Sequence, residues 1–106
     1  MKIRRTTDGY VFWCPGCDEV HGVWTDGKRG ANWGFNGNVE APTFTPSVRH
    51  FHPAHDDQPE KTFCHYFIVD GKFNFCNDCD HELNGQQCVE MPDWPYAKGA
   101  FGGIEE

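Results

Sequence analysis

The chain has 106 residues, of which 16 are acidic and 9 are basic, so its formal charge is −7 when the 6 histidines are neutral. This balance argues against nucleic acid as a partner, because neutralising phosphates requires clustered lysine and arginine. The length and the even composition predict a single domain over residues 1–106, with an ordered core over 1–94 and an irregular tail over 95–106.

The first residues contain no apolar run after their basic residues, and no segment is long enough to cross a membrane. We therefore expect neither a signal peptide nor a membrane association, and we predict a cytoplasmic location. In a reducing compartment the 6 cysteines point to metal ligands rather than to disulfides. A domain of this size buries only about two thirds of its unfolded surface, so bound zinc would supply a useful part of its stability.

A first hairpin is expected around Asp8-Gly9, which separates two short strand-like stretches, and residues 20–24 predict a returning strand. Between them, Cys14 and Cys17 flank a Pro-Gly pair, as in the tight turn of a zinc knuckle, where two thiolates project toward one ion. A redox dithiol has the same spacing, but it needs a following helix and a parallel sheet. The sequence predicts neither.

The middle of the chain predicts a strand followed by a loop. Residues 43–51 alternate as a strand, and Pro46 predicts that this strand lies at an edge or carries a bulge. Ser47 is a candidate nucleophile, although a strand serine without a placed base is more simply an ordinary hydroxyl. Residues 52–61 are polar and predict the loop. Three histidines of this region are either ligands of a second ion or incidental polar residues: His50, His52 and His55.

A second β-hairpin is predicted over residues 63–76, because Asp70-Gly71 favours a two-residue turn between alternating strands. This turn places His65 opposite Cys76. Opposite residues share a face, with Cβ atoms about 5 Å apart, so both side chains can reach one metal ion. The other face of the hairpin is assigned to the core: Tyr66, Ile68, Phe73 and Phe75.

The rest of the chain is expected to contain little regular structure. Residues 78–85 allow about one helical turn that ends at Gly85, and residues 86–91 predict a last strand. The predicted fold class is therefore mainly β, or a small α+β fold at most. We expect a single antiparallel, hairpin-rich, zinc-ribbon-like domain with a zinc knuckle and at most one short helical turn.

These elements predict one zinc site with ligands from distant parts of the chain. The knuckle supplies two thiolates, and the hairpin supplies an imidazole and a thiolate: Cys14, Cys17, His65 and Cys76. Cys79 and His81 are alternates for the fourth position, and Cys64 and His21 are further substitutes or neighbours of the metal. Structural zinc contributes about 10–16 kcal/mol of apparent folding free energy. Because a whole domain is stable by only about 5–15 kcal/mol, losing the metal is expected to unfold it.

Three stretches, taken in order, carry a family resemblance: "CPGCDEVHG", "NWGFNGNVEAPTFTPSV" and "CHYFIVDGKFNFCNDCDHELNGQQCVEMPDW". They resemble a family of small zinc-binding proteins of unknown function that is common in phages and prophages and is often labelled ammonia monooxygenase. A related branch accompanies bacterial ubiquitin-like conjugation operons. The resemblance runs from Val11 to Trp94 and therefore covers most of the chain.

The resemblance implies a set of recurring positions: the cysteine pair, Pro46-Ser47, Cys64-His65, Asp78, Cys79 and His81. The ubiquitin-like branch is similar in placing a histidine and a cysteine at His65 and Cys76. Phage members often have an aliphatic residue at the latter position. The completion of the metal site is therefore left open between Cys76 and His81.

Two functions are expected from these features. The first is a non-enzymatic domain with a structural zinc, encoded by a phage or prophage, that binds a host or phage protein in the bacterial cytoplasm. The second, implied by the ubiquitin-like branch, is a zinc-dependent peptidase or isopeptidase acting on a ubiquitin-like protein. Such an enzyme needs an open metal position and a base. Its candidate catalytic residues are Asp78, His81 and Ser47.

Overall fold

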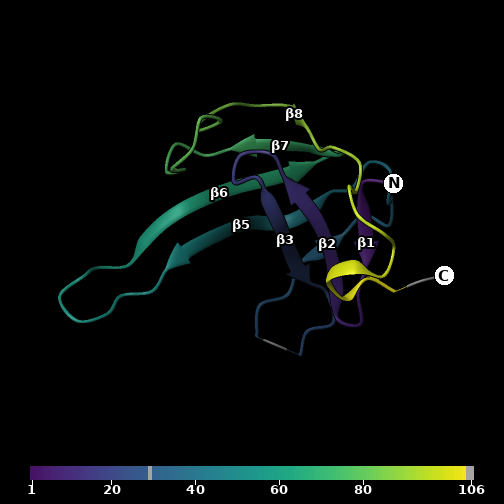
Figure 1. Ribbon diagram of the computed structural model, residues 1–106, viewed down its shortest axis with the longest axis horizontal. Helices are drawn as coiled ribbons and strands as arrows, with labels where there is room; N and C mark the ends of the chain where they lie inside the picture. The colour runs from purple at the N-terminus through teal and green to yellow at the C-terminus, as the bar shows by residue number, and fades with distance from the viewer. Residues whose placement is uncertain (29, 105–106) are drawn as a thin grey trace.

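The computed structural model describes residues 1–28 and 30–104, which form two antiparallel β-sheets (Figure 1). The smaller sheet has the strand order β1-β2-β3, and the larger has the order β4-β5-β6-β7-β8. The strands are β1 (Ile3–Arg5), β2 (Gly9–Cys14), β3 (Glu19–Trp24), β4 (Gly34–Phe35), β5 (Phe44–His52), β6 (Lys61–Val69), β7 (Lys72–Phe75) and β8 (Val89–Glu90). The prediction of a mainly β, hairpin-rich fold is confirmed.

The hairpin of β6 and β7 forms in the predicted register. Val69 pairs with Lys72, which leaves Asp70 and Gly71 as the two-residue turn. Both turn residues have positive φ angles, 50° and 76°, as a type I′ turn requires. This register determines which side chains of β6 face the core and which face outward.

The hairpin of β1 and β2 also forms, with a wider connection than the one expected around Asp8-Gly9. Arg5 pairs with Tyr10, so residues 6–9 make the turn. The chain then returns as β3, which agrees with the predicted strand. Glycine is required at position 9, because a Cβ there would lie 1.9 Å from the carbonyl oxygen of the neighbouring strand.

β5 carries a bulge, one of the two alternatives that Pro46 predicted. The pairing of β5 with β6 shifts between Phe44 and Val48. Residues 45–47 therefore stand opposite one residue of β6, Phe67, and a bulge of this kind bends the strand and re-aims its side chains. Figure 1 shows β5 and β6 as a long curved ribbon whose connecting loop extends beyond the smaller sheet.

Residues 78–85 do not form the expected helical turn and instead make successive tight turns. The Gly85 N–H donates to the Cys76 carbonyl at 3.1 Å. The side-chain oxygen of Asn84 accepts a hydrogen bond from the Cys79 N–H at 2.8 Å. Such local side-chain bonds offer the backbone an alternative to helical bonds, which explains the difference.

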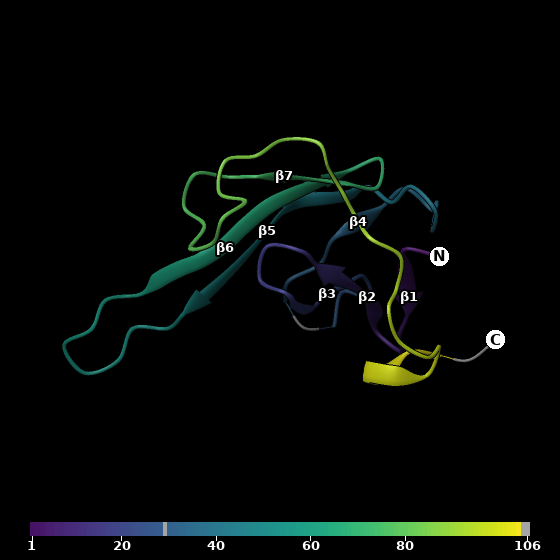
Figure 2. The same cartoon turned by 45° about the horizontal axis from the view of Figure 1, so that its top comes forward.

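The segment after Trp94 packs beside the smaller sheet (Figure 2). The Ile104 N–H donates to the Arg5 carbonyl at 2.8 Å. In the described part of the chain, the one helical element is the short 3-10 helix η1 (Ala100–Gly102). Among the described residues, no helix is long and apolar enough to cross a membrane.

The core lies between the two sheets. Phe12 of β2 reaches across to the larger sheet, where its ring centroid lies 6.1 Å from those of Phe44 and Phe73. Alternate residues of β6 face this core, as expected for a half-buried strand. The buried apolar residues are Ile3, Phe12, Cys14, Val23, Phe44, Val48, Cys64, Tyr66, Ile68, Phe73, Phe75 and Met91.

Candidate active site and metal centre

Neighbouring residues of β6 point to opposite faces of the larger sheet, and this alternation divides the functional side chains into two sets. Cys64 is fully buried on the inner face, toward the smaller sheet. His65 lies on the outer face, where its side chain is 24 % exposed. The two sets therefore meet very different surroundings.

On the outer face, a hydroxyl, an imidazole and a carboxylate lie in series. The Ser47 Oγ atom is 3.0 Å from His65 Nε2. The other ring nitrogen, Nδ1, lies 3.1 and 3.2 Å from the two carboxylate oxygens of Asp78. These distances allow the carboxylate to hold the imidazole in the orientation and tautomer in which it can accept the serine proton.

The bulge of β5 positions the serine. Ser47 is the last of the residues that stand opposite Phe67, next to the point where regular pairing with β6 resumes. The indole N–H of Trp33 donates to the Ser47 carbonyl at 3.2 Å and ties the bulge to the segment before β4. Pairing with β6 and the hydrogen bond from Trp33 therefore fix the backbone that positions the Ser47 hydroxyl.

The turns after β7 position the carboxylate. The Cys76 N–H donates to the His65 carbonyl at 2.9 Å. The backbone N–H of His65 donates to Cys79 Sγ at 3.3 Å, and the Cys79 thiol donates to the carbonyl oxygen of His65 at 3.2 Å. Asp78, which lies between these two cysteines in the sequence, is therefore held against the imidazole.

Exposed apolar side chains surround this site. Phe67 is 47 % exposed, and its ring centroid lies 6.5 Å from that of His65. Val69 and Phe51 are 43 % and 41 % exposed. The guanidinium of Arg49, which pairs across from the histidine, lies 4.4 Å from the Phe51 ring centroid. The outer face therefore offers a contact surface directly beside the hydroxyl.

On the inner face, three cysteines and a histidine form a set that we call the thiol cluster: Cys14, Cys17, Cys64 and His81. The sulfurs of Cys14 and Cys64 lie 4.0 Å apart, and Cys64 Sγ lies 3.5 Å from His81 Nε2. Donor atoms of Cys17, Cys64 and His81 all lie within 4.8 Å of one another. Around a tetrahedral zinc ion, two sulfurs stand about 3.8 Å apart, and a sulfur and a nitrogen about 3.6 Å apart. Cys17, Cys64 and His81 are therefore spaced as ligands of one metal ion, with the Cys14 sulfur beside that of Cys64.

The knuckle turn packs directly on the histidine of the thiol cluster. A Cβ atom at Gly16 would lie 2.3 to 2.7 Å from ring atoms of His81. Only glycine permits this approach, which brings the imidazole beside the two knuckle cysteines. The Pro-Gly pair predicted the turn, but not the side chain that the turn contacts.

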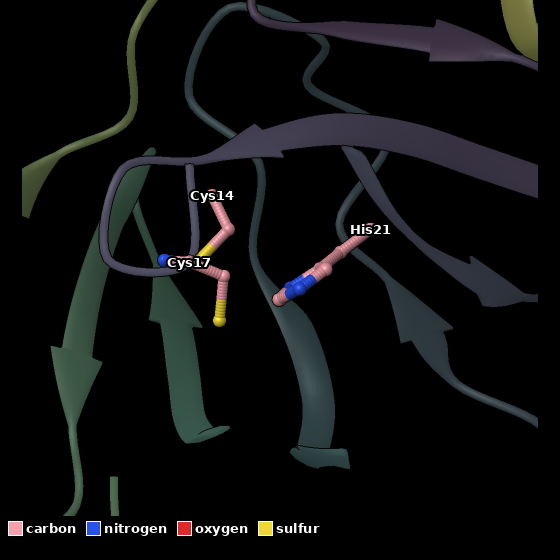
Figure 3. A group of neighbouring side chains, drawn as sticks. All are labelled: Cys14, Cys17 and His21. Carbon is pink, nitrogen blue, oxygen red and sulfur yellow. The ribbon is translucent and has the colours of Figure 1, made fainter. Parts of the chain in front are cut away.

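A second imidazole lies beside the knuckle (Figure 3). Donor atoms of Cys14, Cys17 and His21 also lie within 4.8 Å of one another, and the figure shows all three side chains projecting from the β2–β3 hairpin. His21 Nδ1 lies 3.0 Å from the Tyr66 hydroxyl, and His50 Nε2 lies 3.0 Å from the same oxygen. Buried polar groups thus form a connected network next to the cluster.

Close packing changes the acidity of the cysteines. Burial raises the pKa of the Cys17 thiol to about 12, since a buried thiolate is poorly solvated. The hydrogen bond from Cys64 lowers the pKa of Cys14 to about 4, and the same contact raises the pKa of Cys64. Without a cation, repulsion therefore opposes ionisation of several neighbouring thiols at once. Metal binding would release their protons.

The structure brings together parts of the predicted ligand set but divides it between the two faces. Cys14 and Cys17 adjoin each other on the inner face, whereas His65 and Cys76 share a donor group with Asp78 on the outer face. The alternation of β6 explains the division, because the residue that faces the knuckle is the one before the histidine. The alternates differ as well: His81 lies in the thiol cluster, and Cys79 bonds to the backbone of β6.

The loop histidines separate in the same way. His50 contacts the buried tyrosine, and burial together with the neighbouring His21 lowers its pKa to about 4. His52 and His55 are exposed. None of the metal-ligand groups found among the described residues contains either of them.

A serine, a histidine and a carboxylate in hydrogen-bonding series are the arrangement of side chains on which serine hydrolases rely. Over residues 1–76, the chain matches the model of a family described as bacterial ubiquitination-like system serine protease (BubE), and it belongs to that family. The matched range includes Ser47 and His65 but ends before Asp78, which the structure adds. The match supports the ubiquitin-like branch of the expected resemblance and not the phage branch. Comparisons with curated proteins and with solved structures gave no match.

Proposed function

We propose that this chain is a serine peptidase of a bacterial ubiquitin-like system, with Ser47 as the nucleophile, His65 as the general base and Asp78 as the residue that orients it. The observation that carries the proposal is the hydrogen-bonded series itself, with 3.0 Å from hydroxyl to imidazole and 3.1 Å from imidazole to carboxylate. Membership of the family supports the same reaction.

In this mechanism, the Ser47 oxygen attacks the scissile carbonyl while its proton moves to His65 Nε2. The imidazolium then gives that proton to the leaving amine as the peptide bond breaks, which leaves an acyl-enzyme. A water molecule attacks the ester, with the same imidazole as base, and regenerates the serine. Asp78 keeps the proton on Nδ1 throughout and stabilises the imidazolium between the steps.

The proposed substrate is the tail of a ubiquitin-like protein, bound in an extended conformation across the outer face. Phe67 and Val69 lie on β6 beyond the histidine, and Phe51 lies on β5 beyond the serine. Apolar surface on both sides of the scissile position suits an extended segment whose alternate side chains face the enzyme. The protein partner expected from the sequence is, in this proposal, the substrate.

The metal of the thiol cluster is zinc in this proposal, because a set of three thiolates and one imidazole is a typical structural zinc sphere. Cys14, Cys17, Cys64 and His81 would fill all four positions, and a closed sphere binds no substrate. When bound, the ion supplies stability rather than chemistry. It also links the knuckle to β6 and to the turns after β7, the two elements that carry His65 and Asp78.

The test combines a serine-directed fluorophosphonate probe with a ubiquitin-like precursor that carries extra residues after its tail. We expect the zinc-loaded protein to be labelled at Ser47 and to remove the extra residues, and Ser47→Ala to do neither. Thr45→Ala is the matched control, since its hydroxyl lies on the same strand. Cleavage that persists in Ser47→Ala, or that stops as soon as a chelator removes a labile ion from folded protein, would favour the zinc-dependent hydrolase instead.

A further inference from the structure

One side chain at the outer site has no part in the proposed mechanism. Cys76 is partly buried, and a donor atom of this residue lies within 4.8 Å of donor atoms of both His65 and Asp78. The backbone bond from the Cys76 N–H to the His65 carbonyl, 2.9 Å long, keeps the two residues side by side. Asp78, the third member of this group, contacts the imidazole at Nδ1.

These donors match the preferences of a particular class of cation. A thiolate, an imidazole nitrogen and a carboxylate oxygen are the three kinds of protein ligand that zinc takes, and cadmium prefers the thiolate more strongly still. Three protein ligands leave one position of a tetrahedral ion for water. The side chains of His65 and Asp78 are 24 % and 48 % exposed, so an ion has access from solvent.

We propose that His65, Cys76 and Asp78 form an inhibitory site for a soft divalent cation, zinc in the first place. The inference rests on the proposed function, because the ion acts by occupying residues of the serine site. It is distinct from the thiol cluster, which lies on the opposite face of β6.

The inhibition follows from the two ring nitrogens of His65. Nδ1 is the nitrogen that faces Asp78, and Nε2 is the one that faces Ser47. An ion bound at Nδ1 displaces the proton there, and the neutral ring then carries its proton on Nε2. In that tautomer the imidazole cannot accept the proton of the serine hydroxyl. The Cys76 thiol loses its own proton to solvent, so one proton is released for each ion bound.

Two further properties of the site follow. Burial, Asp78 and Cys79 raise the pKa of Cys76, and binding of a cation displaces the proton of the thiol. Binding of the ion also replaces the hydrogen bond between Asp78 and the imidazole with one bond from the ion to each of these groups. Ion binding and an active serine are therefore mutually exclusive.

The experiment uses protein whose thiol cluster is already loaded with zinc, and it titrates Cd²⁺ as the probe. Two signals are followed: the rate of fluorophosphonate labelling, normalised to the rate of each variant without added ion, and the ultraviolet absorption of the cadmium–thiolate bond. Cys76→Ser is compared with wild type. Cys88→Ser serves as the control, because Cys88 is exposed and lies outside the donor groups.

We expect the absorption to rise and the labelling to fall over the same range of Cd²⁺ in wild type and in Cys88→Ser. In Cys76→Ser, the part of the absorption that rises together with inhibition should be lost, and half-inhibition should require at least about tenfold more ion. Cadmium that replaces zinc in the thiol cluster absorbs equally in both proteins. Equal sensitivity of Cys76→Ser and wild type, or a cadmium absorption that depends on Cys76 but does not accompany a loss of labelling, would overturn the inhibitory site. If the serine mechanism fails instead, no labelling occurs even without the ion, while the absorption difference between the variants still reports on the site.

Discussion

The two faces of β6 perform different tasks with similar side chains. The inner face presents Cys64 to thiols and an imidazole that are buried or half-buried, and the outer face presents His65 to a hydroxyl and a carboxylate that solvent can reach. One step along the strand separates the two. Partners and burial together distinguish the two faces: several thiols gathered around the fully buried Cys64 suit a structural ion, whereas a hydroxyl, an imidazole and a half-exposed carboxylate suit a reaction with a substrate.

Removing the inner donor should have the largest effect. Cys64→Ala leaves the thiol cluster with too few ligands for a closed zinc sphere. Structural zinc contributes about 10–16 kcal/mol, so this variant should lose the metal and unfold. Metal content and far-ultraviolet circular dichroism measure the two effects. Cys88→Ala is the control and should keep both; a folded, metal-free Cys64→Ala would remove the structural role from the inner face.

Changes at the outer face should stop the reaction and leave the fold intact. Ser47→Ala is expected to lower the cleavage rate by about a millionfold, by analogy with nucleophile removal in other serine peptidases. Asp78→Asn should cost about ten-thousandfold, because the imidazole loses its correct tautomer. Stopped assays on the precursor provide the rates, and calorimetry provides the melting temperature. A large fall in melting temperature for Ser47→Ala would mean that the two faces are not separable.

The pH dependence of stability tests how far water is excluded from the inner face. His50 has its pKa lowered to about 4 by burial, against about 6.5 in an unfolded chain, so the unfolded state takes up the proton first. Its contribution to the free energy of unfolding is full above about pH 6.5 and is lost as the pH falls toward about pH 4. Urea denaturation at several pH values measures this slope.

The variants His50→Gln and His55→Gln separate this group from the others that titrate in the same range. Glutamine can still hydrogen-bond to the tyrosine but does not titrate, so His50→Gln should show a shallower loss of stability on acidification. His55→Gln, a change at an exposed residue of the β5–β6 loop, is the control. An unchanged slope in His50→Gln would place the titrating group elsewhere.

The smallest effect is expected at the apolar rim of the outer site. Phe67→Ala removes a contact with the substrate tail and should raise KM by about three- to tenfold with little change in kcat. Its stability should change by no more than about 0.5 kcal/mol, because the side chain is exposed. Phe101→Ala is matched in exposure and lies far along the chain. If both variants had the same KM, the tail would bind elsewhere.

Local signals in the sequence were sufficient to predict the two hairpins. The Asp70-Gly71 turn fixed the register of β6 on β7, and with it the neighbourhood of His65 and Cys76, because a two-residue turn leaves no freedom in the pairing. The bulge followed from Pro46 in the same way. These features depend on residues that are close together along the chain.

The assignment of side chains to the two faces depended on distant contacts that the sequence does not record. Ser47 lacked a visible base because its register against His65 is set across the β5–β6 loop and through a bulge of unpredictable size. The choice of Cys64 and His81 for the thiol cluster depends on how the smaller sheet packs on the larger one. The resemblance marked Ser47, His65 and Asp78 as recurring positions, but spacing alone did not join them.

The loop at the far end of the β5–β6 ribbon is a suitable site for attaching a tag. Residues 53–60 are exposed, and the ribbon carries them away from the smaller sheet (Figure 1). Exposed loop tips of this kind tolerate inserted segments. A peptide tag or fluorophore placed there would allow immobilisation or single-molecule imaging while the serine and the histidine remain aligned.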